Sequence, residues 1–71
     1  MIDYPKITIV TPCFNHGDYI GETIESVVSQ GYPNLEYFVI NDGSTDNSEE
    51  VILKYKKYNF TYFRRRKKKN L

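Results

Sequence analysis

Residues 7–12 read ITIVTP, a short segment whose first four residues are all β-branched and alternate little in polarity. Such a segment is typical of a parallel strand that is buried on both faces. Because Pro12 cannot donate a hydrogen bond to a neighbouring strand, we expect this strand to cover residues 7–10 and to end before the proline. The segment therefore predicts the first strand of a parallel sheet.

The next segment has the pattern of an amphipathic helix. Its apolar residues recur at helical spacing, with polar residues between them: Ile20, Ile24, Val27 and Val28. Asp18 is expected to cap the start of this helix. Gly31 is expected to end it in a left-handed conformation, and Pro33 prevents any continuation.

The remaining chain repeats this order of elements. Residues 35–40 predict a second strand that ends in the polar turn NDGSTD at 41–46, and a second helix follows to about residue 58. Asp46 and Glu49 have the spacing of a capping box at the start of that helix. Residues 60–63 predict a third strand. The order β-α-β-α-β, with connections too long for hairpins, predicts an α/β, Rossmann-like fold with a three-stranded parallel sheet and two helices.

In such sheets ligands bind at the carboxyl ends of the strands, where two loops of this chain meet, residues 11–17 and 41–46. Neither loop carries the glycine pattern of a dinucleotide fingerprint or a P-loop. An ionised Asp42 can accept hydrogen bonds from a uracil N–H or a ribose hydroxyl, and Phe14 can cover the base. Alternatively, Asp42 only builds the turn before Gly43 and Phe14 only closes the end of the sheet. The residues leave both interpretations open.

Three motifs together resemble the N-terminal part of family 2 glycosyltransferases, which have the GT-A fold: ITIVTPCFN at 7–15, IESVVSQGYPNLE at 24–36 and NDGSTD at 41–46. The resemblance covers residues 6–63. It implies a nucleotide-diphospho-sugar donor, expected to be UDP-linked, and inverting transfer of the sugar to an acceptor hydroxyl. It also implies a nucleotide-binding site formed by Pro12, Phe14, Asn15, Asp42 and Gly43. Asn41 departs from the aspartate that is common at its position in the family.

The same resemblance shows what this sequence lacks. The family holds a divalent metal, Mg²⁺ or Mn²⁺, with a D-x-D motif and uses a later carboxylate as the base. Here no two aspartates are spaced two apart, and no acid follows Glu50. We therefore expect no catalytic residue, metal ligand or cofactor in this chain, and a metal only in a complete enzyme. The chain is interpreted as a truncated donor-binding part, ended by a frameshift or early stop near codon 64.

Charge is distributed unevenly along the chain. Residues 1–50 carry one base and all nine acids, a net charge of −8, whereas residues 51–71 carry the other nine bases and no acid, a net charge of +9. We expect residues 1–63 to form the N-terminal, nucleotide-sugar-binding part of a glycosyltransferase 2-like domain and residues 64–71 a basic tail. The alternative function is a small non-catalytic module that binds nucleic acid through this basic, aromatic C-terminus; under the first interpretation no specific nucleic acid is expected.

The composition also bears on compartment and assembly. One cysteine, Cys13, and one histidine, His16, exclude an intrachain disulfide and a zinc knuckle. No apolar run is long enough to span a membrane and no signal peptide opens the sequence, so a cytoplasmic location is expected. The first strand should have an unprotected apolar edge, through which the chain is expected to self-associate.

Overall fold

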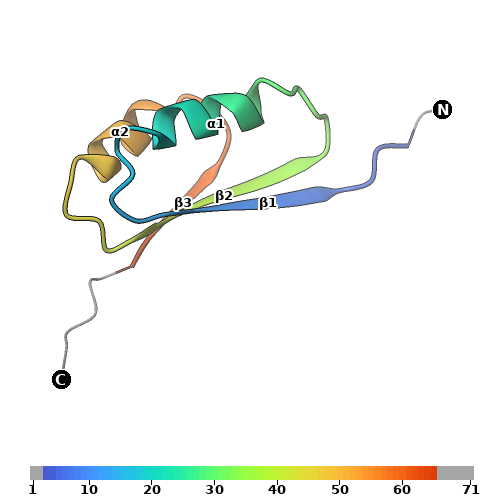
Figure 1. Cartoon of the computed structure of the whole chain (residues 1–71). Coiled ribbons are helices and arrows are strands. Elements are labelled where there is room, and N and C mark those ends of the chain that lie inside the picture. The colour runs from blue at the N-terminus through green and yellow to red at the C-terminus, as the bar shows by residue number, and fades with distance from the viewer. Residues whose placement is uncertain (1–2, 66–71) are drawn as a thin grey trace.

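A computed structural model of the chain describes residues 3–65. Strands and helices alternate along it: β1 (Ile7–Cys13), α1 (Ile20–Val28), β2 (Leu35–Asp42), α2 (Ser48–Lys54) and β3 (Thr61–Arg65) (Figure 1). β2 lies in the middle of the sheet and pairs in parallel with both β1 and β3. The predicted α/β fold, with three parallel strands and two helices, is therefore confirmed.

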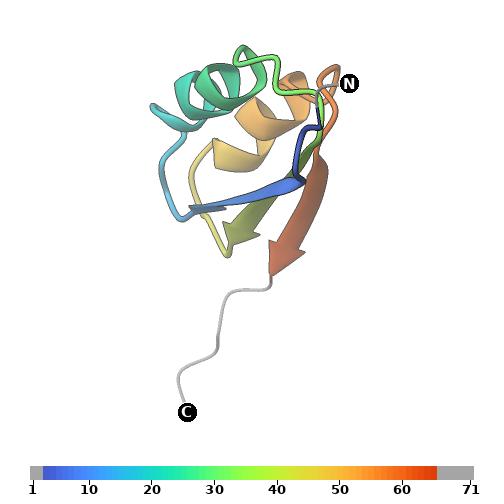
Figure 2. The same ribbon diagram turned by 90° about the vertical axis from the view of Figure 1, so that its right-hand side faces the viewer.

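Both helices lie on one face of the sheet, as Figure 2 shows. The buried core between the two layers consists of Cys13, Ile20, Ile24, Tyr37, Val39, Ile52 and Phe60. The opposite face of the sheet carries no helix within residues 3–65. The prediction that the first strand is buried on both faces is therefore wrong: Val10 is 51% exposed, because the described residues cover only one side.

The strand ends also differ from the prediction. β1 continues past Val10 through Pro12 to Cys13. Within residues 3–65, β1 pairs only with β2, and a proline is tolerated in such an edge strand because its missing N–H costs no ladder bond on the free side. β3 extends to Arg65, so the predicted boundary between residues 63 and 64 falls inside a strand. The rest of the predicted basic tail, residues 66–71, lies outside the described residues.

The prediction for the start of α1 is wrong, whereas the prediction for its end is confirmed. Asp18 does not cap the helix; Tyr19 is the N-cap residue and makes no side-chain cap bond. Instead the backbone N–H groups of Tyr19 and Ile20 donate to the carbonyl of His16 at 2.9 and 2.8 Å. Gly31 has a φ of +67°, which confirms the predicted left-handed residue after the helix.

Neither helix is long and apolar enough to cross a membrane, as far as residues 3–65 are concerned.

Candidate functional site

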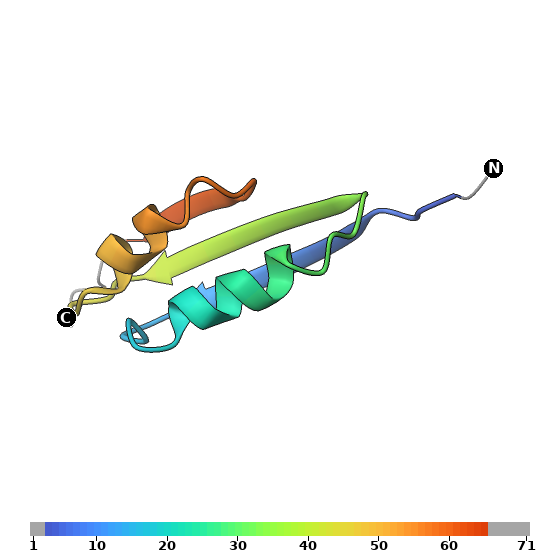
Figure 3. The ribbon, with the colours of Figure 1, turned by 90° about the horizontal axis from the view of Figure 1, so that it is seen from above.

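Two loops leave the carboxyl end of the sheet side by side, residues 14–19 between β1 and α1 and residues 43–47 between β2 and α2. Figure 3 shows both loops at the same end of the molecule. The β1–β2 ladder ends at the pair Cys13 and Asn41. Phe14 is the first residue after β1, and Asp42 is the last residue of β2. The sheet therefore brings the two residues of the predicted nucleoside clamp to adjacent strand ends.

Both of these residues are accessible. Phe14 is 54% exposed, unusually high for a phenylalanine. The Asp42 side chain is 51% exposed, and its Oδ1 lies 3.4 Å from Nε of Arg65. An ion pair with this much exposure contributes only about 0–1 kcal/mol, so a ligand can replace it at little cost.

The other predicted site residues lie nearby. Pro12 is an exposed residue of β1, on the sheet face that carries no described helix. Gly43 follows Asp42 directly and has a φ of +74°, a conformation that disfavours any side chain. The glycine lets the chain turn sharply from β2 into the loop.

Asn15 joins the two loops. It adopts a left-handed conformation with a φ of +53°. Its side-chain Oδ1 accepts hydrogen bonds from the backbone N–H of Thr45 at 2.8 Å and of Asp46 at 3.3 Å, and from the Thr45 hydroxyl at 3.4 Å. Its own backbone N–H donates to Oγ of Ser44 at 2.9 Å. The two loops therefore exchange hydrogen bonds in both directions at this residue.

The next two residues of the first loop continue this pattern. The backbone N–H of His16 donates to Oγ of the buried Ser48 at 3.1 Å. The backbone N–H of Gly17 donates to Oδ2 of Asp46 at 3.0 Å. Three consecutive amides of the β1–α1 loop are thus satisfied by side chains of the β2–α2 region, which fixes one loop against the other.

Asp46 organises the start of α2 in a way that the sequence did not predict. Its Oδ1 accepts hydrogen bonds from the backbone N–H of Ser48 at 2.9 Å and from the Ser48 hydroxyl. These bonds, with the Ser48 hydroxyl first and the Gly17 amide second, lower the pKa of the Asp46 carboxyl. The predicted capping box is wrong, because Asn47 is the N-cap residue and makes no side-chain cap bond.

Glu49, the other half of that predicted box, instead faces β3. It accepts hydrogen bonds from the Tyr62 hydroxyl at 2.8 Å and from Nη1 of Arg64 at 3.2 Å. Burial is the largest cause of the raised pKa of Tyr62. Arg64, expected in a basic tail, thus lies in β3 and contacts Glu49, and no local pattern indicates contacts between residues that are 15 positions apart.

Asn41, a buried residue of β2, supports the β2–α2 loop through its side chain. It is 2% exposed, its Nδ2 donates to the Tyr62 hydroxyl at 3.1 Å, and its Oδ1 accepts from the backbone N–H of Ser44 at 3.1 Å. An amide side chain meets both demands because it carries a donor and an acceptor. Asn41 therefore acts as a buried support for the turn.

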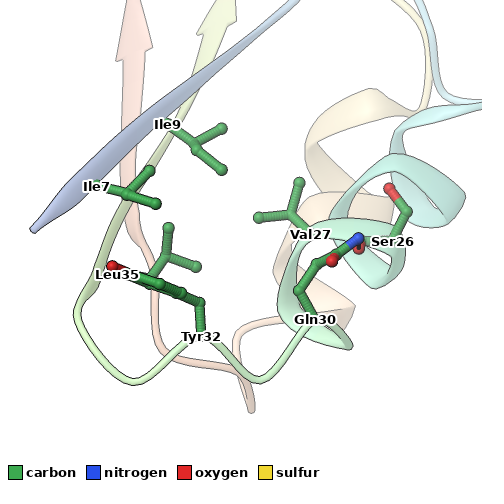
Figure 4. A pocket seen from close by; sticks show the side chains of 7 residues that line it. All are labelled: Ile7, Ile9, Ser26, Val27, Gln30, Tyr32 and Leu35. Carbon is green, nitrogen blue, oxygen red and sulfur yellow. Dashed lines mark hydrogen bonds between the residues drawn. The ribbon is translucent and has the colours of Figure 1, made fainter. Parts of the chain in front are cut away.

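A polar hollow of about 320 Å³ adjoins this support, lined by Asn41, Gly43, Ser44, Thr45, Asp46, Glu49, Arg64 and Arg65. It contains both acidic and basic side chains. A second hollow, of about 300 Å³, lies at the opposite end of the sheet between β1 and α1 (Figure 4). Ile7, Ile9, Val27 and Leu35 make it largely apolar, and no charged side chain lines it. Of the predicted site residues, Gly43 lines the first hollow and none lines the second.

The described residues do not fit a metal ion. Within residues 3–65, no three side chains of His, Cys, Asp or Glu come together in a way that could hold one.

Comparison with known proteins gives consistent matches. The family model described as "Glycosyl transferase family 2" matches residues 8–71. The glycosyltransferase TuaG of Bacillus subtilis is 36% identical over 53 residues, which are 75% of this chain and 21% of that protein. The poly-beta-1,6-N-acetyl-D-glucosamine synthase of Staphylococcus epidermidis is 41% identical over 51 residues, which are 72% of this chain and 12% of that protein.

A solved structure is similar in fold. It is the mannosyltransferase PcManGT of Pyrobaculum calidifontis in complex with GDP-Man and Mn²⁺, with a TM-score of 0.81 and 21% sequence identity. The match covers 97% of this chain and 22% of that one. The chain thus spans about a fifth or less of the length of these relatives.

Proposed function

Because the chain belongs to glycosyl transferase family 2, we propose that its two loops bind the nucleotide part of a nucleotide-diphospho-sugar donor. The reaction of the complete enzyme is then sugar transfer to an acceptor hydroxyl. The single observation that carries the proposal is the pair Phe14 and Asp42, both exposed at adjacent strand ends on loops that are fixed to each other. The proposed site comprises Pro12, Phe14, Asp42 and Gly43, together with Asn15, which joins the two loops through hydrogen bonds to residues 44–46.

Each residue of the pair has a definite role in this proposal. The Asp42 carboxylate accepts hydrogen bonds from a base N–H or from ribose hydroxyls, since an ionised aspartate offers only acceptors. The Phe14 ring covers the face of the base, and stacking of this kind is worth about 1–3 kcal/mol. Arg65 moves away from Asp42 when the ligand binds, at the small cost typical of an exposed pair.

We propose uracil as the base, and this finer choice is tested together with the site. Isothermal calorimetry with UDP and with GDP at millimolar concentration measures both affinities. Asp42→Ala should remove most of the binding, whereas Asp3→Ala, an equivalent change outside both loops, should leave it unchanged. Equal binding with and without Asp42 contradicts the proposed site, and tighter binding of GDP than of UDP contradicts the choice of uracil.

The alternative function is nucleic-acid binding through the basic C-terminus. The salt dependence of binding distinguishes it from nucleotide binding by the two loops. Binding that neutralises backbone phosphates weakens steeply as ionic strength rises, because counterions are released. Recognition of a nucleoside by Phe14 and Asp42 should change little over the same range. Titration of a single-stranded oligonucleotide and of uridine, which carries no phosphate, at about 50 and 200 mM salt distinguishes the two.

Two further expectations belong to this proposal. We propose that the chain self-associates through the free edge of β1, which pairs with no second strand within residues 3–65. We also propose a reducing, cytoplasmic location, the compartment favoured by a single buried thiol, Cys13.

A further inference from the structure

We propose that Asn15 is a positioning residue, which fastens the β2–α2 loop to the β1–α1 loop and so holds Phe14 and Asp42 ready to receive the nucleotide. The ligand in this inference rests on the function proposed above. The fastening itself rests on contacts within the chain. We call these contacts, between Asn15 and residues 44–46, the loop latch.

The latch occupies the whole hydrogen-bonding capacity of the Asn15 side-chain oxygen. It accepts from Thr45 N–H, Asp46 N–H and the Thr45 hydroxyl at 2.8, 3.3 and 3.4 Å. A carbonyl oxygen has two lone pairs, so three donors leave it no capacity for a ligand. The Asn15 oxygen therefore serves the neighbouring loop and not the nucleotide.

The backbone of Asn15 fits the same role. A φ of +53° is uncommon for residues other than glycine, and Asn and Asp adopt it most readily. In this conformation the backbone N–H reaches Oγ of Ser44 at 2.9 Å while the side chain reaches residues 45 and 46. Asn15 thus forms hydrogen bonds with three consecutive residues of the other loop.

The latch lies next to the residues that it positions. Asn15 directly follows Phe14, and its partner Ser44 lies two residues after Asp42. Asn41 holds the backbone N–H of Ser44 from the strand side at 3.1 Å. Ser44 is therefore held by Asn41 on one side and by Asn15 on the other, and a site held in its binding geometry loses less entropy when it binds a ligand.

Substitutions at position 15 separate positioning from direct contact. Asn15→Asp keeps the acceptor oxygen and the tolerance of a left-handed backbone, but loses the amide donors. Asn15→Gly keeps the backbone conformation and the backbone N–H bond to Ser44, and it removes the side-chain contacts of the latch with Thr45 and Asp46. The probe is uridine, because it carries no phosphate that the added charge of the aspartate could repel. NMR titration measures its affinity, at a temperature where circular dichroism shows each variant to be folded.

We expect Asn15→Asp to bind uridine within about twofold of the wild-type affinity. We expect Asn15→Gly to bind roughly tenfold more weakly, the loss that corresponds to one or two net hydrogen bonds. Wild-type affinity in Asn15→Gly overturns the inference, because the latch is then dispensable. An equal loss in both variants also overturns it, because Asn15 then contacts the ligand through its amide N–H groups.

Amide hydrogen exchange gives a readout that needs no ligand. The N–H groups of Thr45 and Asp46 should exchange faster in Asn15→Gly than in Asn15→Asp, and unchanged exchange overturns the latch. If uridine does not bind the wild-type chain, the proposed function fails, while the exchange experiment still shows whether the latch forms.

If Asn15→Gly does not fold, Ser44→Ala takes its place and should weaken uridine binding by about two- to fivefold, since it removes one contact. Unchanged affinity in that variant counts against the inference.

Discussion

Asp46 shows how a single exposed side chain joins two distant parts of the chain. Its two carboxylate oxygens accept hydrogen bonds from Gly17 on one loop and from Ser48 at the start of α2. All of these bonds favour the ionised form, and together they outweigh the opposing effect of desolvation on the pKa. The charge of Asp46 therefore contributes to folding.

We predict a specific pH dependence from this residue. The pKa of Asp46 is lower in the folded state than the ordinary value of 3.8, so its contribution to stability is present above that value. The contribution is lost as the pH falls through the lower folded-state pKa. Asp46→Asn should therefore unfold at lower urea than the wild type at pH 7, and the difference should shrink towards pH 3. A constant difference at all pH values contradicts this role.

Contacts of this kind also mark the limit of what the sequence could predict about the site. Asp46 and Glu49 have capping-box spacing, but Asp46 binds Gly17, 29 positions earlier, and Glu49 binds Tyr62, 13 positions later. The partners come together only through the parallel sheet, which no local pattern encodes. The position of the two loops at the strand ends was predictable, because it follows from the order of the elements; the hydrogen bonds between the loops were not.

The elements themselves were largely predictable, because their signals are local. The helical spacing of Ile20 and Ile24 and the apolar run of β2 identified α1 and the central strand. Errors occurred where the fold overrides a local rule. Pro12 remains within β1 because it lies on an edge strand. Arg64 belongs to β3, where its backbone is in register with Asn41 of β2 and its side chain contacts Glu49.

The end of α1 gives a prediction with a definite size. Gly31 has a φ of +67°, and a Cβ added there would meet no atom within 4 Å. The cost of Gly31→Ala is therefore backbone strain alone, and it should lower the free energy of unfolding by about 1 kcal/mol. Gly31→Asn should lose less, since asparagine tolerates this conformation. Urea denaturation measures both variants, and an unaffected Gly31→Ala contradicts the assigned backbone.

The edge strand β1 gives a prediction about assembly. Val10 is 51% exposed in the middle of a strand that has one free edge within residues 3–65. Val10→Lys should reduce self-association, because a charged side chain on an edge strand discourages pairing. Leu53→Lys, at a residue of α2 that is also 51% exposed, is the matched control. Sedimentation velocity compares the variants, and an equal effect of both places the association elsewhere.

At the scale of the whole molecule, the sheet has helices on one side only among the described residues (Figure 2). On its other face the rings of Phe38 and Phe63 stack with centroids 5.9 Å apart, and Phe63 is still 50% exposed. A two-layer unit of this size buries a smaller fraction of its surface than a larger domain does, so the stability that remains after the loss of chain entropy is small.

Thermal unfolding tests this expectation. The isolated 71-residue chain should melt below about 65 °C, the upper range of ordinary mesophile domains. The transition should also depend on protein concentration if copies associate. A sharp, concentration-independent transition of a monomer above that temperature contradicts the account of the one-sided sheet.

The claim that the two loops form a nucleotide site is tested most directly by mapping the amide chemical shifts of the chain as UDP is added. The account predicts that the largest changes occur at Phe14, Asp42 and Gly43 and at their neighbours in residues 14–17 and 43–46. The hollow at the opposite end, around Ile7, Val27 and Leu35, should remain unchanged. Shifts that concentrate in that hollow, or that leave Phe14 and Asp42 unaffected at saturating UDP, would contradict it.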